Sequence, residues 1–478
     1  MSESKPITPF AARPVLAVAA VVALAQLTAA IAGSGYWFDE VYMLAIGRHH
    51  LDWGSADQPP LTPAVAALAD WLFPSSIVAL RITAILATSA AVVVAGLIAM
   101  ELGCDRRAQI LVATGQATTL WIGLAGHWLT PYALEPVQWL VIFWLLVRWI
   151  RLRDDRLLLA MGIVVGIAAM TKFQVLLLCA VLLGAVAVFG PRTILRRPML
   201  WLGVAAAALI AAPTLAWQLA NGWPQLKMAA IVAEESGPLY GGRPSVAVLL
   251  VVLAGATMTV LAGYGIWRLL RADELRDYRF IAVSLLAIYV VFVASGGRPY
   301  YLGGAYAVLA AAGALGLQRR RESGHDGMRW AVWPACTVSA ALAVAAVVLG
   351  AMLTRSAVPE EIASHTAAVY HRLSPAQQDR TAIVGESYIV AAYVDGYSQR
   401  YGMPRAYSTT RSYGYFPPPP DRQDAALFVG SDPGRWASHF DHVQELGVVS
   451  GDLKAWLLTG RRQTWPEMWA NLRTLRVA

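Results

Sequence analysis

Eleven apolar runs, separated by short loops rich in arginine, dominate this 478-residue chain. The sequence is 57% hydrophobic and 14% charged, whereas soluble domains carry about 25% charged residues. Runs of this length can cross the hydrocarbon core of a bilayer, which is about 30 Å thick. The sequence therefore predicts an α-helical polytopic membrane protein with about 11 transmembrane helices. The runs lie at 14–33, 77–100, 108–126, 133–150, 157–171, 173–190, 199–219, 246–269, 279–296, 299–317 and 330–353.

The basic residues orient these spans. With a cytoplasmic N-terminus, the inner loops hold 17 arginines and the outer loops hold five basic residues. Cytoplasmic loops are enriched in arginine and lysine, so we predict a multi-pass protein of the plasma (inner) membrane with an external C-terminal part. A signal peptide cleaved after Ala30-Ile31-Ala32 is an alternative for the first run, and it would leave the other spans unchanged. The five outer basic residues are Arg48, Lys172, Lys227, Arg243 and Arg298.

Two outer loops are too long to be simple turns. The first covers 34–76 and includes the apolar stretch 61–73, which predicts a helix lying in the membrane interface. The other covers 220–245. Long ordered loops usually carry function, so residues 1–353 are expected to form a transmembrane catalytic domain with these two loops at its outer face.

The remaining residues, 354–478, change in character. They hold 13 Lys and Arg and 12 Asp and Glu, together with strand-like runs at Thr381–Gly385 and Ala425–Gly430. Each run is followed by a polar or helical stretch. We therefore predict a small external α/β domain of ordinary size.

Several classes of function are excluded or disfavoured. The formal charge of +8 reflects arginines in topology-setting loops, so nucleic acid is not expected as a partner. No glycine-rich phosphate loop or dinucleotide fingerprint is present. The three cysteines offer no disulfide framework. An activated substrate at the outer face would therefore be lipid-linked, since soluble nucleotides are scarce there.

The pair Asp39-Glu40 follows the first span, in the outer loop. Carboxylates near a bilayer are costly unless they are solvated, paired or used. One interpretation is a general base acting on an acceptor hydroxyl. The other is a pair of solvated acids at a helix end.

Lys172 and Arg298 are the outer basic residues that interrupt apolar sequence. Both could bind a lipid phosphate, as lysine and arginine often do. Both could instead snorkel from helix ends to the interface. The sequence alone leaves the two interpretations open.

A few further residues are candidates for ligand contact. His127 and Glu135 flank a short outer turn, and His49, His50 and Asp57 could join them in space, but the spacing matches no metal motif. No metal site is therefore predicted, and no cofactor is certain, although a divalent metal stays open. Glu135 fits better as a polar lining of a substrate cavity. Trp223, beside Asn221, contacts substrate or belongs to the aromatic belt.

A set of ordered motifs resembles a known family. They are Phe38-Asp39-Glu40-Val-Tyr42, Asp57-Gln-Pro-Pro-Leu61, Ala79-Leu-Arg81, Thr130-Pro-Tyr-Ala-Leu-Glu135-Pro, Gly166-Ile-Ala-Ala-Met-Thr-Lys172, Trp217-Gln-Leu-Ala-Asn-Gly-Trp-Pro224, Arg298-Pro-Tyr-Tyr-Leu302 and Val384-Gly-Glu-Ser-Tyr-Ile-Val-Ala-Ala392. The set looks like the GT-C membrane glycosyltransferases, in the branch of the protein O-mannosyltransferases and the lipid A aminoarabinose transferases. Each motif is short, but their order covers nearly the whole chain.

The resemblance implies a reaction. A sugar on a polyprenyl phosphate would be the donor, and Asp39 would deprotonate the acceptor hydroxyl, with Glu40 as the neighbouring acid. Lys172 matches a family lysine near the cavity, and Arg298 falls where a basic residue could meet phosphate. The substrate-binding residues expected from the motifs are Asp57, Tyr132, Glu135, Asn221, Trp223, Tyr300 and Tyr301.

Two departures limit the resemblance. Gln58 stands where family members often have histidine, which puts a role for that side chain in doubt. The repeated sugar-binding domains of eukaryotic protein mannosyltransferases are absent from the sequence, which weakens a protein acceptor. The acceptor thus stays open between an envelope glycan, a lipid and a protein, and the sugar is not identified.

The main alternative is a transporter or flippase for lipid-linked sugars. Such a protein is expected to carry acids or broken helices near the middle of the membrane. Here the acids lie at the outer edge, which favours an enzyme. A scaffold that only displays the tail domain would not explain the loop motifs.

Overall fold

A computed structural model describes residues 8–325 and 329–477, and the chain divides into two compact units. The first, called the helical unit, comprises Met1–Ala32, Arg81–Pro213 and Val232–Ala351. The second, called the mixed unit, comprises Gly33–Leu80, Thr214–Ile231 and Met352–Ala478. The mixed unit is therefore built from three segments that are far apart in the sequence.

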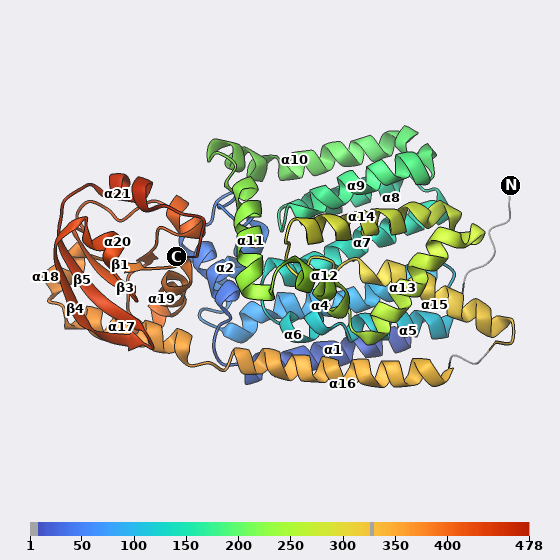
Figure 1. The fold of residues 1–478 in the computed structure, drawn as a ribbon, viewed down its shortest axis with the longest axis horizontal. Coiled ribbons are helices and arrows are strands. Elements are labelled where there is room, and N and C mark those ends of the chain that lie inside the picture. Colours follow the sequence, from blue (N-terminus) through green and yellow to red (C-terminus); the bar gives the residue numbers. More distant parts are fainter. Residues whose placement is uncertain (1–7, 326–328, 478) are drawn as a thin grey trace. The chain divides into compact units, whose positions relative to one another are not determined.

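The helical unit consists of α-helices that are mostly apolar (Figure 1). Helices α7, α8, α9 and α14 pack in sequence against one another. Helices α4 and α10 cross the boundary between the units. The helices are α1 (Ala12–Ala32), α4 (Ile77–Glu101), α5 (Arg106–Ala117), α6 (Leu120–Ala125), α7 (Pro131–Leu152), α8 (Arg156–Ala169), α9 (Gln174–Phe189), α10 (Pro198–Ala220), α12 (Arg243–Val252), α13 (Ala256–Arg271), α14 (Arg279–Ala294), α15 (Tyr306–Glu322) and α16 (Arg329–Leu353), with short 3₁₀ turns η1 (Arg192–Arg196) and η2 (Asp273–Tyr278).

Each of the eleven apolar runs contains one of these helices or a pair of them. Within the described residues, six helices are long and apolar enough to span a membrane, and a seventh candidate is the pair α12 and α13, which meet at 96°. The other runs form shorter apolar helices, such as α8 and α9. The predicted polytopic helical fold is confirmed.

Glycines allow the closest helix contacts in this unit. A Cβ atom on Gly265 of α13 would lie 1.8 Å from the Leu309 carbonyl oxygen of α15. A Cβ atom on Gly162 of α8 would lie 2.2 Å from the Gly203 carbonyl oxygen of α10. Small residues let helix backbones approach in membranes, where packing replaces the hydrophobic effect.

Ion pairs join α4 and α7 at one end of the helical unit. Glu101, at the C-terminal end of α4, accepts hydrogen bonds from Arg148 (2.6 Å) and Arg151 (2.6 Å) of α7. The Glu101 carboxylate is fully buried, so two guanidinium groups compensate for the lost hydration of one acid. Helix α7 begins at Pro131, 17 residues before Arg148 and 20 before Arg151, so its first turn lies about 25–30 Å from these arginines along the helix axis.

The mixed unit carries the only β-sheet among the described residues. The strand order is β2-β1-β3-β5-β4, with β1 parallel to β2 and β3, and with β5 antiparallel to β3 and β4. The two strands predicted from the sequence occur at the same residues, as β1 (Thr381–Gly385) and β3 (Ala425–Gly430), both fully buried. The other strands are β2 (Ala406–Tyr407), β4 (Phe440–Ser450) and β5 (Leu453–Arg461).

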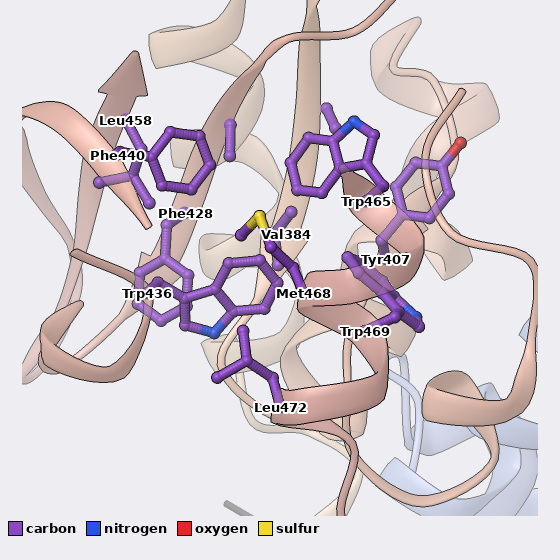
Figure 2. Close-up of a cluster of buried hydrophobic side chains, with 12 residues drawn as sticks. Val384, Tyr407, Phe428, Trp436, Phe440, Leu458, Trp465, Met468, Trp469 and Leu472 are labelled. Carbon is purple, nitrogen blue, oxygen red and sulfur yellow. The ribbon is translucent and has the colours of Figure 1, made fainter. Parts of the chain in front are cut away.

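Helices surround this sheet, and aromatic side chains fill the space beside it. Trp469 packs edge to face on both Trp436 and Trp465 (Figure 2). Trp436 and Trp465 in turn pack at tilted angles on Phe428 and Phe440 of the sheet. The helices of the mixed unit are α2 (Phe38–His49), α3 (Leu61–Leu72), α17 (Val358–Arg372), α18 (Pro375–Arg380), α19 (Tyr388–Tyr401), α20 (Gly434–Ala437) and α21 (Trp465–Leu472), with the 3₁₀ turn η4 (Arg411–Tyr415); α11 (Pro224–Tyr240) begins here and ends in the helical unit.

The segment 33–80 is bound firmly to the C-terminal residues within this unit. Arg48 of α2 forms a bidentate ion pair with Asp70 of α3, with hydrogen bonds of 2.7 and 2.6 Å. It also donates to the carbonyl oxygens of Asp395 and Gly396 in α19. Gly396 lies against Val41, where a Cβ atom would approach to 2.3 Å. Helices α2, α3 and α19 therefore form one packed group that contains the Asp39-Glu40 pair.

Candidate active site

A lysine held between an acid and two aromatic rings is the most distinctive polar group of the helical unit. Lys172 follows α8, and its Nζ lies 3.3 Å from Oε2 of Glu135, in the first turns of α7. The same Nζ lies 4.2 Å from the ring centroid of Tyr301 and 5.2 Å from that of Tyr300. We call Lys172, Glu135, Tyr300 and Tyr301 the lysine cluster.

The two charged partners differ in how deeply they are buried. The Lys172 side chain is 19% exposed, whereas the Glu135 side chain is 7% exposed. Oε1 of Glu135 has no hydrogen-bond partner among the described residues. The cluster thus contains a buried carboxylate, a cation with an accessible side, and spare hydrogen-bonding capacity that a bound molecule could use.

Further aromatic rings pack against Tyr300 of the lysine cluster. Tyr300 stacks on Trp121 at 4.4 Å, and Tyr132 lies against both rings, at 4.9 Å from Tyr300 and 5.3 Å from Trp121. Three predicted substrate residues, Tyr132, Tyr300 and Tyr301, therefore gather around Lys172. Trp121 was not among the residues predicted from the sequence, because stacking partners cannot be inferred from residue spacing.

Arg298 lies two residues before Tyr300 and is also paired. Its guanidinium donates to Glu235 of α11, and both side chains are mostly buried, at 12% and 18% exposed. The Tyr240 ring lies 5.6 Å from the guanidinium carbon. Glu235 lies in the outer-loop segment 220–245, but no pattern of residues indicated that it would contact Arg298.

The pair Asp39-Glu40 lies in the mixed unit, in the first turn of α2. A carboxylate is favourable at a helix N-terminus, where backbone N–H groups and the helix dipole are positive. Glu40 is fully buried and Asp39 is partly buried. The Asp39 charge acts on Tyr393 of α19, where burial and this charge raise the pKa of the tyrosine to about 12.

Asp57 is oriented by two hydroxyl groups. Its Oδ1 accepts from the Tyr42 hydroxyl at 2.8 Å and from the Ser412 hydroxyl at 2.6 Å. Burial and the Asp57 charge hold the pKa of Tyr42 well above its usual range, so Tyr42 stays a donor. Gln58 reaches Oδ2 of Asp57 at 3.4 Å. Tyr42 and Ser412 are functional candidates that were missed, although Tyr42 belongs to the motif that begins at Phe38.

Asn221 and Trp223 form a tight turn between α10 and α11. Gly222 and Trp223 both have left-handed backbones, with φ of 73° and 54°. A bulky residue in this conformation is strained and is held by its surroundings. Here the Trp223 N–H donates to the Gln218 carbonyl at 2.8 Å, while the Gln218 side chain donates to Ser55 at 2.9 Å. The turn thus fixes Trp223 within the mixed unit.

The histidines of the first loop are neutral at ordinary pH. Burial and the Arg48 charge lower the pKa of His49 to about 4, and burial with the Arg405 charge lowers that of His50 to about 3. The His50 ring stacks on Phe416 at 3.9 Å. His127 donates its Nδ1–H to Oε1 of Gln26 at 2.8 Å. Within 8–325 and 329–477, no group of three or more His, Cys, Asp or Glu side chains is placed to hold a metal ion.

The predicted residues therefore gather in two sets. Lys172, Glu135, Tyr132, Tyr300 and Tyr301 are in mutual contact in the helical unit, with Arg298 next to them in the sequence. The mixed unit holds the other set, which is Asp39, Glu40, Asp57, Asn221 and Trp223. The candidate phosphate-binding residues and the candidate base therefore lie in different units.

The comparisons with known proteins agree with this architecture. Residues 57–217 match the family described as dolichyl-phosphate-mannose-protein mannosyltransferase. The crystal structure of ArnT from Cupriavidus metallidurans in the apo state is similar, with a TM-score of 0.66, 15% identity, and coverage of 93% of this chain and 97% of that chain. The chain has the GT-C fold. The GT-C fold predicted from the ordered motifs is thereby confirmed.

Two further structures have this GT-C fold. ArnT from the same organism bound to undecaprenyl phosphate gives a TM-score of 0.61 at 15% identity, with the same coverage of 93% and 97%. The arabinofuranosyltransferase AftD from Mycobacteria gives 0.54 at 14% identity, and 93% of this chain covers 40% of that chain. No curated protein sequence matches the chain.

The family match covers about a third of this GT-C chain. It includes Asp57, Tyr132, Glu135 and Lys172, and it ends before the turn that carries Trp223. Asp39 and Arg298 lie outside the matched segment. The residue roles in this GT-C chain therefore depend on its own geometry.

Proposed function

We propose that the chain is an inverting glycosyltransferase that moves a sugar from a polyprenyl-phosphate donor to an acceptor hydroxyl at the outer face of the plasma membrane. The observation that carries the proposal is the lysine cluster. A cation with an accessible side, backed by Glu135 and two tyrosine rings, suits a phosphate that gains charge as it leaves.

Two features make Lys172 suitable for this role. The Glu135 carboxylate and the Tyr301 ring fix the ammonium group in place, so little side-chain entropy is lost on binding. The ammonium group has three donors, and one carboxylate oxygen occupies only part of this capacity. Arg298, held by Glu235, would supply a second positive group. The GT-C structure of ArnT bound to undecaprenyl phosphate supports a polyprenyl phosphate as the donor class.

The reaction follows from these assignments. The acceptor oxygen attacks the anomeric carbon, and its proton passes to the Asp39 carboxylate as general base. The bond between the anomeric carbon and the phosphate oxygen breaks, and its electron pair leaves with the lipid phosphate. Attack from the opposite face inverts the anomeric centre. Glu40, at the same helix end, orients the acceptor or tunes the charge beside Asp39.

The remaining residues would bind the sugar and acceptor. Asp57, fixed by Tyr42 and Ser412, presents its second oxygen for a sugar hydroxyl. Trp223, in its strained turn, offers an aromatic face of the kind on which sugars stack. The acceptor is an envelope glycan, lipid or protein. On the orientation proposed from the arginines, the N-terminus is cytoplasmic and residues 354–478 are external.

One observation favours a transporter or flippase instead. Helices α12 and α13 meet at 96° and together form a broken span, a feature that transporters use at their binding sites. Movement of a lipid-linked sugar would leave the glycosidic phosphate bond intact. The two functions are therefore separated by whether purified protein cleaves that bond.

The test is transfer by the purified full chain of a labelled sugar from a polyprenyl phosphate. Asp39→Asn should reduce the rate about 100- to 10,000-fold, the usual contribution of a general base. Asp52→Asn, an exposed acid in the same loop, is the matched control and should transfer normally. Near-normal transfer by Asp39→Asn would exclude Asp39 as the base.

Mass spectrometry of envelope lipids, glycans and exported proteins would identify the substrates. Cells with and without the gene should differ by one sugar on one class of acceptor. An unchanged envelope, together with sugar movement across vesicle membranes, would instead support the flippase.

A further inference from the structure

A pocket of about 650 Å³ lies in the helical unit, apart from the lysine cluster. Three helices each contribute one face. Helix α5 supplies Arg107, Ile110, Leu111 and Thr114, at the spacing of a single helix face. The volume is in the range of sites that bind small molecules, so the pocket can hold a sizeable part of an amphipathic molecule.

Charge is concentrated at one end of the pocket. Arg107 stands in the first turn of α5, and Arg320 and Arg321 stand in the last turn of α15. Arg321 pairs with the Asp105 carboxylate, and the backbone N–H of Asp105 donates to Oε1 of Gln318 at 2.7 Å. Arg107 and Arg320 are exposed, and with the residues that the structure describes neither forms an ion pair. Two cationic side chains thus remain available at this end.

The rest of the pocket wall is mostly apolar. From Arg107 to Thr114, α5 advances about 10 Å along its axis, and the antiparallel α15 advances as far from Arg321 to Ala314. Between these points the wall is formed by aliphatic side chains and by Trp333 of α16. An anion of the size of a lipid headgroup could bind the arginines while its acyl chain packed against the apolar wall.

Exposed tryptophans place this site at a membrane surface. Trp330 and Trp333 begin α16 and are 79% and 73% exposed. Tryptophan is enriched at the boundary between hydrocarbon and water, and arginine at helix ends reaches the headgroups. The C-terminal end of α15 and the N-terminal end of α16 lie side by side there (Figure 1).

This end of the unit is also remote from the lysine cluster. Helix α5 begins five residues after Glu101, which pairs with the last turns of α7, whereas Glu135 lies in the first turns of α7. On the proposed orientation, the pocket opens toward the cytoplasmic leaflet. It is therefore a separate site from the one assigned to the donor phosphate.

We propose that this pocket binds an anionic phospholipid of the cytoplasmic leaflet, with the phosphate of its headgroup at Arg107 and Arg320 and an acyl chain along α5, α15 and α16. Basic pockets between transmembrane helices have this chemistry in general. A soluble anion would use the arginines but would leave the apolar wall and Trp333 without a partner. The proposal does not depend on the transfer reaction.

The test is lipid binding to the purified full chain, measured by native mass spectrometry. Three probes separate the sources of a phosphate: dioleoyl phosphatidylglycerol, dioleoyl phosphatidylcholine and glycerol 1-phosphate. Phosphatidylglycerol should bind most tightly. The double variant Arg107→Ala with Arg320→Ala should weaken phosphatidylglycerol binding about 25-fold, or about fivefold for each arginine. The double variant Arg107→Lys with Arg320→Lys keeps both charges and should retain most of the affinity.

The matched control is Arg196→Ala with Arg276→Ala, which removes two exposed arginines outside the pocket. It should leave phosphatidylglycerol binding unchanged. Cys336 lines the pocket, so bound lipid should also slow its alkylation. An equal loss in the control, unchanged binding in the pocket variant, or equally tight binding of glycerol 1-phosphate would overturn the proposal.

Discussion

The pairing of Lys172 with Glu135 allows a sharp test of whether the lysine binds substrate or only balances a buried acid. Removing one partner of a buried ion pair leaves the other charge without compensation, at a cost of about 3–5 kcal/mol. Since the Glu135 side chain is 7% exposed, Lys172→Met should destabilise the protein by about the lower end of that range. A loss of binding in this variant alone would therefore be ambiguous.

The double variant Glu135→Gln with Lys172→Met removes that ambiguity. Both charges are gone, so its melting temperature should return close to that of the wild type. Its affinity for a polyprenyl phosphate should nevertheless stay low. A hydrogen bond to a charged group contributes about 1.5–3 kcal/mol, which corresponds to a loss of about 10- to 150-fold.

The measurements are the melting temperature and the dissociation constant for the same detergent-purified samples. Glu135→Gln alone provides the control, because it keeps the cation and removes the competing negative charge, while the amide oxygen can still accept from the Lys172 ammonium group. That variant should bind the phosphate as tightly as the wild type or more tightly. Wild-type affinity in the double variant would refute the reasoning and would reduce Lys172 to a counter-charge for Glu135.

Three other predictions concern the mixed unit. Ser412→Ala removes one of the two hydroxyl donors to Asp57 and should raise KM several-fold with little change in melting temperature; an unchanged KM would argue against a substrate role for Asp57. Trp465→Ala should cost about 3–5 kcal/mol by leaving a cavity in the aromatic core, measured as hydrogen exchange of β3 and β5 in the full chain. Burial raises the pKa of Asp395 to about 7, above its unfolded value, so its contribution to stability is present at low pH and is lost as pH rises toward 7. Between about pH 4 and pH 7, the melting temperature of Asp395→Asn should therefore rise relative to that of the wild type. His49 and His50, whose pKa values are lowered, stabilise both proteins as pH rises and so cancel in this difference. A difference in melting temperature that stays constant with pH would contradict the prediction.

Much of the fold could be predicted because the membrane imposes a strong signal. A span must be apolar over its whole length, so α16 at Arg329–Leu353 matches the run expected at 330–353. The strands at 381–385 and 425–430 were equally clear, since strands buried on both faces appear as continuous apolar runs.

Elements with mixed sequences were harder to predict. Helix α2 was not predicted within the first outer loop, because its ends carry Asp39, Glu40, Arg48 and His49. Strand β4 is largely exposed and pairs only with β5, so it lacks the buried pattern that marks β1 and β3. In both cases the element is stabilised by its neighbours and not by its own composition.

Contacts between distant residues could not be predicted at all. The motifs placed Lys172 and Arg298 in the site, but their acidic partners lie 37 and 63 residues away on other helices. The snorkelling alternative for both residues assumed no such partners. Side-chain pairs of this kind depend on how helices are rotated and packed, which residue spacing does not determine.

The three-part origin of the mixed unit has a consequence for how the protein is made. Residues 33–80 leave the ribosome early, whereas their partners in 352–478 are synthesised last. Until then Arg48 has no α19 carbonyls to bond and Asp57 has no Ser412. Chains generally fold from the N-terminus during synthesis, but this unit must wait for every intervening helix to be inserted. The mixed unit is therefore completed only after its last segment has been synthesised, and premature termination would leave this unit incomplete.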